Sequence, residues 1–210
     1  MADEHAADPL EDPSSKVAKI LAAAREAFMR DGLNDTSMDA VAKRAGVSKA
    51  TLYVYFASKD VLFAAVMKRE RERFGLTIGA ITVRSDADIE TTLTDVGTRF
   101  LKYVISPSAV TFFRVTVSES LRFPDLAKTV MGAGREELIG CVEAILARAA
   151  AAGVLELDDP RRAAGQFLSL VKSDLHMNCL VDPAYRPPTD AIARQVQESV
   201  EFFMFRYRRR

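Results

Sequence analysis

A chain of 210 residues can form one medium-sized domain, or a small domain fused to a larger one. Hydrophobic residues make up 49% and charged residues 28%, the balance of an ordinary globular protein, and the formal net charge is zero. No apolar run approaches the ~18 residues that a membrane-spanning helix needs, so we expect no membrane partner. Residues 1–15 are acidic and lack the apolar segment of a signal peptide, so we expect a disordered leader on a cytoplasmic protein.

The few cysteines and histidines argue against metal or disulfide chemistry. Cys141 and Cys179 form no CxxC pair, and His5 and His176 lie far apart in the sequence. We therefore expect no metal, no cofactor and no disulfide, with both cysteines in the core of a cytoplasmic protein. Residues 16–60 carry eight Lys or Arg against five Asp or Glu, which is a weak basic footprint for nucleic-acid phosphates.

The hydrophobic periodicity is helical nearly throughout, which predicts an all-α fold. Serine caps and glycine ends place the first four helices at about 15–30, 37–45, 49–56 and from 58 to between 75 and 82. Thr36 and Ser37 both offer cap hydroxyls for the second of these, and Thr36 has a capping-box spacing to Asp39. Five more helices are predicted at roughly 86–105, 107–121, 124–152, 160–180 and 189–208.

The second and third helices have the pattern of a helix-turn-helix. Gly46, Val47 and Ser48 form a short connection, in which glycine suits a backbone that must turn left-handed. Val47 and Leu52 are expected to fill the space between the helices. The third helix then displays small, hydroxyl-bearing and cationic side chains that can approach phosphates and base edges, namely Lys49, Ala50, Thr51, Tyr53 and Tyr55.

The stretch 36–62 resembles the DNA-binding signature of the TetR family. Its residues 52–56 and 58–62 match the Leu-Tyr-x-x-Phe and Ser-Lys-acid-x-Leu elements, and the resemblance extends over residues 16–67. It implies dimers that bind palindromic operators in double-stranded DNA through the third helix and release them when a small molecule binds. By position it implies phosphate contacts from Thr36 and Ser37, base contacts from Lys49, Ala50 and Thr51, and backbone clamps from Tyr53, Tyr55 and Lys59. Ser48 completes the expected DNA-binding set.

Two positions depart from the family pattern. Residue 50 is often glycine in the family and is Ala50 here, and residue 54 is often aromatic and is Val54 here. We therefore assign no DNA contact to Val54. At most one of Tyr53 and Tyr55 is expected in the core, because residues two apart on a helix face different ways. Lys59 stands at a helix start, where its charge is electrostatically unfavourable, and this favours a phosphate partner.

The remainder of the chain is expected to form a helical body that binds an effector. We predict a leader at 1–15, a DNA-binding domain at 16–60 and a ligand-binding and dimerisation domain at 61–210. Residues 112–181 more loosely resemble a TetR ligand-binding domain, of a subgroup with a Ser-Glu-Ser-Leu-Arg-Phe-Pro-Asp-Leu-like stretch at 118–126. The candidate lining for a small apolar or aromatic effector comprises Phe100, Tyr103, Phe112, Phe113, Cys141, Phe167 and Asp174; plain core packing is the alternative for each aromatic residue.

Two smaller expectations concern pairs of polar side chains. Asp174 and His176 interrupt an apolar helix and are equally compatible with pocket groups, interface hydrogen bonds or a solvated face. Glu119 and Arg122 are expected to pair locally, because they are three residues apart.

A homodimer is expected through apolar residues of the last two helices, namely Phe167, Leu170, Val171, Leu175, Val196, Val200, Phe203 and Met204.

Two other functions compete with a ligand-responsive repressor. An all-helical enzyme would need a catalytic set, and the chain has no Gly-rich phosphate loop, GxSxG or HExxH motif. An architectural DNA binder would have little use for a helical body of ~150 residues. The sequence therefore predicts a regulator whose fourth helix, uninterrupted by Gly or Pro from Ser58 to Phe74, acts as a lever between body and DNA-binding head.

Overall fold

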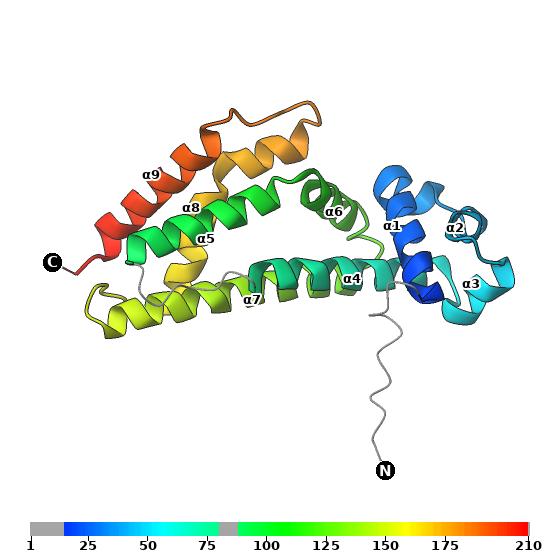
Figure 1. Cartoon of the computed structure of the whole chain (residues 1–210), viewed down its shortest axis with the longest axis horizontal. Coiled ribbons are helices and arrows are strands. Elements are labelled where there is room, and N and C mark those ends of the chain that lie inside the picture. Colours follow the sequence, from blue (N-terminus) through cyan, green and yellow to red (C-terminus); the bar gives the residue numbers. More distant parts are fainter. Residues whose placement is uncertain (1–14, 80–87, 210) are drawn as a thin grey trace, which may run out of the picture. The chain divides into compact units, whose positions relative to one another are not determined.

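The computed structural model describes residues 15–79 and 88–209 (Figure 1). These residues form an all-α fold, as predicted, and the predicted leader lies outside them except for Ser15. The helices are α1 (Lys16–Asp35), α2 (Met38–Ala45), α3 (Lys49–Tyr55), α4 (Lys59–Gly79), α5 (Ile89–Val104), α6 (Pro107–Ser118), α7 (Pro124–Ala151), α8 (Pro160–Val181) and α9 (Ala191–Tyr207). Within these ranges no single helix is long and apolar enough for a membrane span, although α3 with residues 59–70 of α4, bent by 64°, meets both criteria as a pair.

Serine hydroxyls begin the first four helices, because each accepts a backbone N–H that the first helical turn leaves unpaired. The Oγ atoms of Ser15, Ser37, Ser48 and Ser58 each accept the N–H three residues ahead, at 3.0–3.2 Å. The capping box predicted for Thr36 is wrong. Its hydroxyl instead donates 2.7 Å back to the Gly32 carbonyl, where the helical geometry of α1 is interrupted at φ 77°.

The chain divides into two compact units. The first contains residues up to Arg71 together with Val115–Val130, and the second contains Glu72–Arg114 and Met131–Arg210. Helices α4, α6 and α7 each contribute residues to both units. The first unit is larger than the DNA-binding domain predicted at 16–60, whose boundary stays a prediction.

An aromatic cluster forms the centre of the first unit. Phe28 of α1 and Phe63 of α4 are almost fully buried and meet edge to face, with ring centroids 5.4 Å apart. Phe123, in the turn between α6 and α7, lies 5.8 Å from Phe63. Leu52 of α3 and Phe56, the residue that ends α3, are also buried. The helix-turn-helix therefore turns its apolar side chains toward the interior of the first unit, and α2 packs on α1.

The core of the second unit lies between α5, α7, α8 and α9 (Figure 1). Phe167 of α8 and Phe203 of α9 meet edge to face at 5.4 Å, and neither is appreciably exposed. Gly97 of α5 permits this packing, because a Cβ atom there would lie 3.1 Å from Cγ1 of Val196 and 3.4 Å from Cγ2 of Val171. Both valines are fully buried and have no free space into which to move.

Candidate nucleic-acid interface

The turn between α2 and α3 has the geometry that the sequence predicted. Gly46 adopts φ 68° and ψ 30°, a left-handed conformation that only glycine takes without strain. The N–H of Val47 donates to the Ala42 carbonyl at 3.1 Å, which closes the end of α2. Ser48 then begins α3 and also hydrogen-bonds the Thr51 hydroxyl at 2.8 Å. These contacts fix the angle at which α3 leaves α2.

Helix α3 presents one face to its own unit and the opposite face to solvent. Leu52 is fully buried, and Ala50 and Val54 lie roughly opposite it at 100° per residue. Val54 is 81% exposed, while Tyr53 and Tyr55 on its flanks are 44% and 45% exposed, so neither tyrosine is in the core. An exposed isopropyl group at the centre of this face is suited to apolar contact with a thymine methyl group in the major groove.

Val54 is thus a candidate base-facing residue, although the family pattern led us to assign no DNA contact to it. The signal was present in the helical periodicity, because the outermost positions of a short helix follow directly from its buried residue. The structure brings Val54 together with the predicted residues Lys49, Ala50 and Tyr53 on one exposed surface of α3.

Lys49 is positioned by an acidic neighbour on α2. Its Nζ lies 2.8 Å from Oδ1 of Asp39, and both side chains are well exposed. Hydrogen bonding and the charge of Asp39 raise the pKa of the Lys49 ammonium, so it stays cationic at neutral pH. A phosphate or base acceptor can take the place of Asp39 at this ammonium, because ion pairs between exposed side chains are weak.

The two phosphate contacts expected at the start of α2 differ in the structure. Ser37 is exposed, and its oxygen accepts from Ala40 N–H, which leaves its O–H free to donate to a phosphate. Thr36 is 3% exposed, and its O–H already donates to Gly32. The hydroxyl of Thr36 is thus already used within the chain, and the phosphate contact expected from Thr36 stays a prediction. The hydroxyl stabilises the backbone break at the end of α1.

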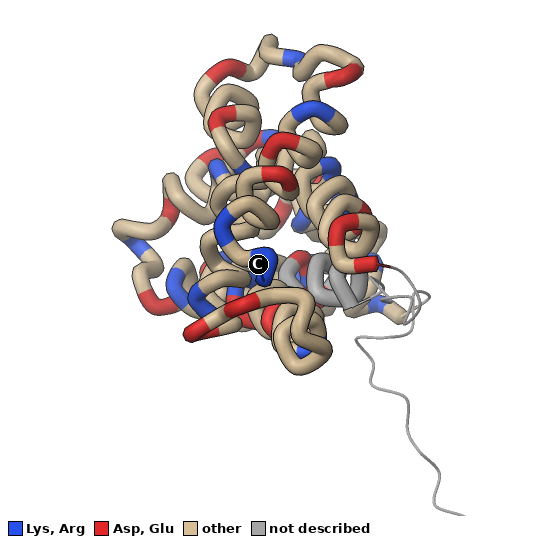
Figure 2. The backbone as a smooth tube through the Cα atoms, turned by 90° about the vertical axis from the view of Figure 1, so that its left-hand side faces the viewer, with Lys and Arg blue, Asp and Glu red and all other residues tan. Residues whose placement is uncertain are grey.

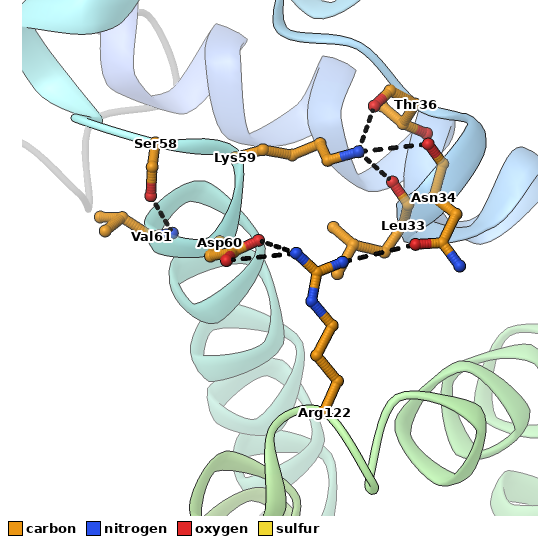
Figure 3. Close-up of polar contacts among 8 residues, drawn as sticks. All are labelled: Leu33, Asn34, Thr36, Ser58, Lys59, Asp60, Val61 and Arg122. Carbon is orange, nitrogen blue, oxygen red and sulfur yellow. Dashed lines mark hydrogen bonds and ion pairs between the residues drawn. The ribbon is translucent and has the colours of Figure 1, made fainter.

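Lys59 also has a different partner from the one expected. Its ammonium, at the first residue of α4, donates to three backbone carbonyls: Leu33 at 2.7 Å and Asn34 at 3.2 Å in the last turn of α1, and Thr36 at 2.9 Å just after that helix (Figure 3). An ammonium has three N–H donors, so the set accounts for all of them. These carbonyls account for a lysine at a helix start. The phosphate contact expected from Lys59 stays a prediction.

Arg122 joins the same region from the turn between α6 and α7. Its guanidinium reaches Asp60 at 3.2 and 3.4 Å, next to Lys59, and the side-chain oxygen of Asn34 at 3.4 Å (Figure 3). The local pair expected between Arg122 and Glu119 is therefore wrong. We call Leu33, Asn34, Thr36, Lys59, Asp60 and Arg122 the head contact set, since it connects the end of α1, the start of α4 and the α6–α7 turn within the first unit.

Charges on the DNA-binding head are largely balanced by neighbours of opposite sign. Figure 2 shows basic and acidic residues following one another along many helices. Arg44 pairs with Glu26 at 2.9 Å, and Arg25 lies 2.7 Å from a carboxylate oxygen of Glu70. The weak basic footprint of residues 16–60 is thus partly compensated, and local geometry on α3 has to supply much of the selectivity for nucleic acid.

The residues predicted to line an effector site divide into two groups in the second unit. Phe100 and Phe167 are core residues, and Asp174 is exposed; their part in an effector site stays a prediction. Tyr103, Phe112, Phe113 and Cys141 are half-buried. The polar residue that is buried on α8 is His176, at 4% exposure, rather than Asp174. Two residues apart, they lie on different sides of the helix, which the sequence pattern could not resolve.

Comparison with known proteins identifies the same two regions. Residues 20–66 match the family model described as bacterial regulatory proteins, tetR family, and residues 91–209 match the model of the AefR-like transcriptional repressor, C-terminal domain. The regulator UidR of Escherichia coli K12 is 42% identical over 55 residues, which cover 26% of this chain and 28% of UidR. The regulator RutR of the same strain is 41% identical over 56 residues, 27% of this chain and 26% of RutR. The chain therefore matches little more than a quarter of the length of these curated relatives.

Two solved structures match over almost the whole chain. The flavonoid-responsive regulator FrrA is 36% identical, with a TM-score of 0.77, over 93% of this chain and 98% of that protein. A protein of Mesorhizobium loti MAFF303099 that is assigned to the tetR family has a TM-score of 0.85 at 24% identity, over 92% and 96% of the two chains. The second likeness establishes the fold alone.

Exchange of the two lysines by methionine tests their separate roles. We expect Lys59→Met to lower the free energy of unfolding by about 1–3 kcal/mol, because three carbonyls lose their shared donor. We expect Lys49→Met to change it by less than about 0.5 kcal/mol, and to weaken DNA binding with a salt slope smaller by about 1. Urea unfolding and DNA titrations at several salt concentrations measure both effects. Unchanged stability of Lys59→Met together with a reduced salt slope would indicate that Lys59 contacts a DNA phosphate.

Proposed function

The chain belongs to the TetR family of transcriptional regulators, which are DNA-binding proteins and not enzymes, and we propose that it is a repressor released from a palindromic operator by a small aromatic effector. The observation that carries this proposal is the match to FrrA along nearly the whole chain, since the name of that protein describes a response to flavonoids. The half-buried aromatic residues Tyr103, Phe112 and Phe113 support an aromatic effector for this chain.

The exposed face of α3 supports a proposed role as recognition helix. Ala50 and Val54 are assigned to base edges, with Lys49 and Thr51 beside them, while Ser37 and the two tyrosines are assigned to the sugar-phosphate backbone. A helix of seven residues reads only a few base pairs. An operator of useful specificity therefore requires two copies of the head, and we propose an inverted repeat with half-sites about one helical turn apart.

The proposed dimer surface differs from the one expected from sequence. Six of the eight residues named for it are buried inside the monomer, and Leu170 and Leu175 are half-buried. The buried six are Phe167, Val171, Val196, Val200, Phe203 and Met204. Their apolar stripe is satisfied by α5 and by packing between α8 and α9. A periodic stripe shows that a helix face is buried, but it does not say whether the covering partner is the same chain or a second copy.

The same two helices carry other apolar residues that stay exposed. Phe202 is 62% exposed and Phe205 is 81% exposed on α9, and Met177 and Val181 are 56% and 71% exposed on α8. Phe202 also lines a groove of about 870 Å³ bounded by α7, α8 and α9. Exposed phenylalanines beside a groove are typical of surfaces that bind another protein. We propose that a second copy of the chain covers this surface.

The head contact set supplies a proposed route from effector to DNA. Helix α6 carries Phe113 in the second unit, and the turn that follows α6 carries Arg122 in the first. A ligand that displaces α6 would displace Arg122 and, through Asp60, the start of α4. Helix α4 itself runs without a break over 21 residues. The effector must bind the DNA-incompetent state more tightly, because equal affinity for both states shifts no population.

Selection of bound sites from random double-stranded DNA, followed by effector titration, tests the proposed function. We expect the selected sites to be inverted repeats, and we expect a hydroxylated flavone such as 7-hydroxyflavone to lower operator affinity by tenfold or more. Fluorescence anisotropy of labelled operator measures this loss, with a basic DNA-binding protein of unrelated fold as control. Selection of single asymmetric sites, or retention of the operator at saturating concentrations across a panel of aromatic compounds, would contradict the proposal.

Phe202→Glu tests the proposed dimer surface. A carboxylate in place of a buried interface phenylalanine costs several kcal/mol per dimer, so we expect a monomer at micromolar concentration in sedimentation velocity. The matched control is Leu121→Glu, which introduces the same charge at a side chain that is 96% exposed in the α6–α7 turn. We expect Leu121→Glu to remain dimeric. A dimer of undiminished stability in Phe202→Glu would place the interface elsewhere.

A further inference from the structure

Helix α8 contains a strained residue in its middle. Ser173 adopts φ 42° and ψ −159°, and it is the one residue other than glycine with positive φ in the ranges 15–79 and 88–209. Such a conformation is strained in a residue with a Cβ atom, and such residues cluster at ligand clamps and switches. The break lies between Lys172 and His176, so the two residues do not have the relative placement that residues four apart have in a regular helix.

His176 is a buried side chain with one unused nitrogen. It is 4% exposed, its ring meets Phe113 edge to face at 5.3 Å, and a hydrogen bond to the Val104 backbone uses one ring nitrogen. Burial, followed by the positive charge of Lys172, lowers the pKa of His176 to about 4, so the imidazole is neutral at physiological pH. Its Nδ1 has no hydrogen-bond partner among the described residues. A neutral imidazole that donates through one nitrogen offers a lone pair at the other, and here that acceptor is buried.

The ammonium of Lys172 lies near the same aromatic ring. Its ammonium lies 5.5 Å from the centroid of the Phe113 ring, the ring that His176 also contacts. Burial lowers the pKa of Lys172, and no ion pair is found for it in the parts of the chain that the structure describes. The half-buried ring of Phe113 therefore contacts both a buried imidazole with an unpaired nitrogen and a partly desolvated ammonium.

We infer that Lys172, His176 and Phe113 form the polar end of the effector site and that this end recognises a phenolic hydroxyl group. The ligand O–H donates to Nδ1 of His176, the ligand oxygen accepts from Nζ of Lys172, and the ligand ring packs on Phe113. This inference rests on the proposed function and narrows its effector from an aromatic molecule to a phenol.

Other ligand groups fit these three side chains less well. A carboxylate accepts from Lys172 but has no proton for His176, so the buried nitrogen gains no partner. A hydrocarbon or an aryl ether leaves the same nitrogen unpaired. An aliphatic alcohol satisfies both polar groups but gains less from an aromatic wall. A phenol satisfies all three at once.

Binding of three matched flavones to the full chain tests the inference. Isothermal titration of the wild type with 7-hydroxyflavone, 7-methoxyflavone and unsubstituted flavone gives the hydroxyl preference directly. We expect 7-hydroxyflavone to bind about tenfold more tightly than either analogue, which corresponds to one charge-assisted hydrogen bond. We expect His176→Phe and Lys172→Met each to remove most of this preference while the affinity for unsubstituted flavone changes less than threefold.

The control is Asp174→Asn, because Asp174 is exposed on the same helix and is adjacent to the break. It should keep the full hydroxyl preference. Thermal unfolding without ligand reports whether each variant is folded, and Lys172→Met, at a half-buried position, supplies a second variant if His176→Phe does not fold. Equal affinity for the three flavones, or a preference that survives in the folded variants, would overturn the inference and leave a buried water as the partner of Nδ1.

The outcomes also separate this inference from the proposed function. Operator release by compounds without a phenolic group, with no binding of 7-hydroxyflavone, would overturn the phenol site and leave the repressor proposal standing. Selective binding of 7-hydroxyflavone without any loss of operator affinity would establish the site and contradict the proposed function.

Discussion

The bonding of one ammonium group to three backbone carbonyls holds the DNA-binding head in place. Lys59 supplies donors to three carbonyls that follow the interruption of α1 at Gly32. The lysine is the first residue of α4, so the same bonds set where α4 begins relative to the helix-turn-helix. Loss of this shared donor leaves the carbonyls without a partner, which costs about 1–3 kcal/mol. The arrangement of the head therefore depends on the lysine at the first residue of α4.

Arg122 completes the head contact set with weaker contacts. Its side chain and that of Asp60 are each almost half exposed, and its bonds are 3.2–3.4 Å long. Exposed pairs of this type contribute about 0–1 kcal/mol, so Arg122 adds little to folding stability. A contact of that strength suits transmission, because a ligand can break it with a small part of its binding free energy. Lys59 would thus hold the elements of the head together. Arg122 would move with α6, and its contacts with Asp60 and Asn34 would then change.

The sequence predicted local structure well and long-range partners poorly. Gly46 and the cap serines determine turns within a few residues, so the helix-turn-helix and the helix order followed from short-range chemistry. The partners of Lys59 lie 23–26 residues away and are backbone atoms that no side-chain pattern reveals. For the same reason Thr36 was assigned to phosphate, and a stripe that includes Phe203 was assigned to a dimer partner. His176 and Asp174 could be told apart only once the break at Ser173 had fixed which of them is buried.

The most direct test of this account is the effector concentration that releases half of the operator from Arg122→Gln. Loss of the Arg122 contacts should raise that concentration at least fivefold, while operator affinity without effector and effector affinity without DNA each stay within about twofold of the wild type. Lys128→Gln is the matched control, because among the described residues Lys128 pairs with Asp125 at the surface of α7, and it should behave as the wild type. Release of Arg122→Gln at the wild-type effector concentration would contradict the proposal that the head contact set couples the effector site to DNA.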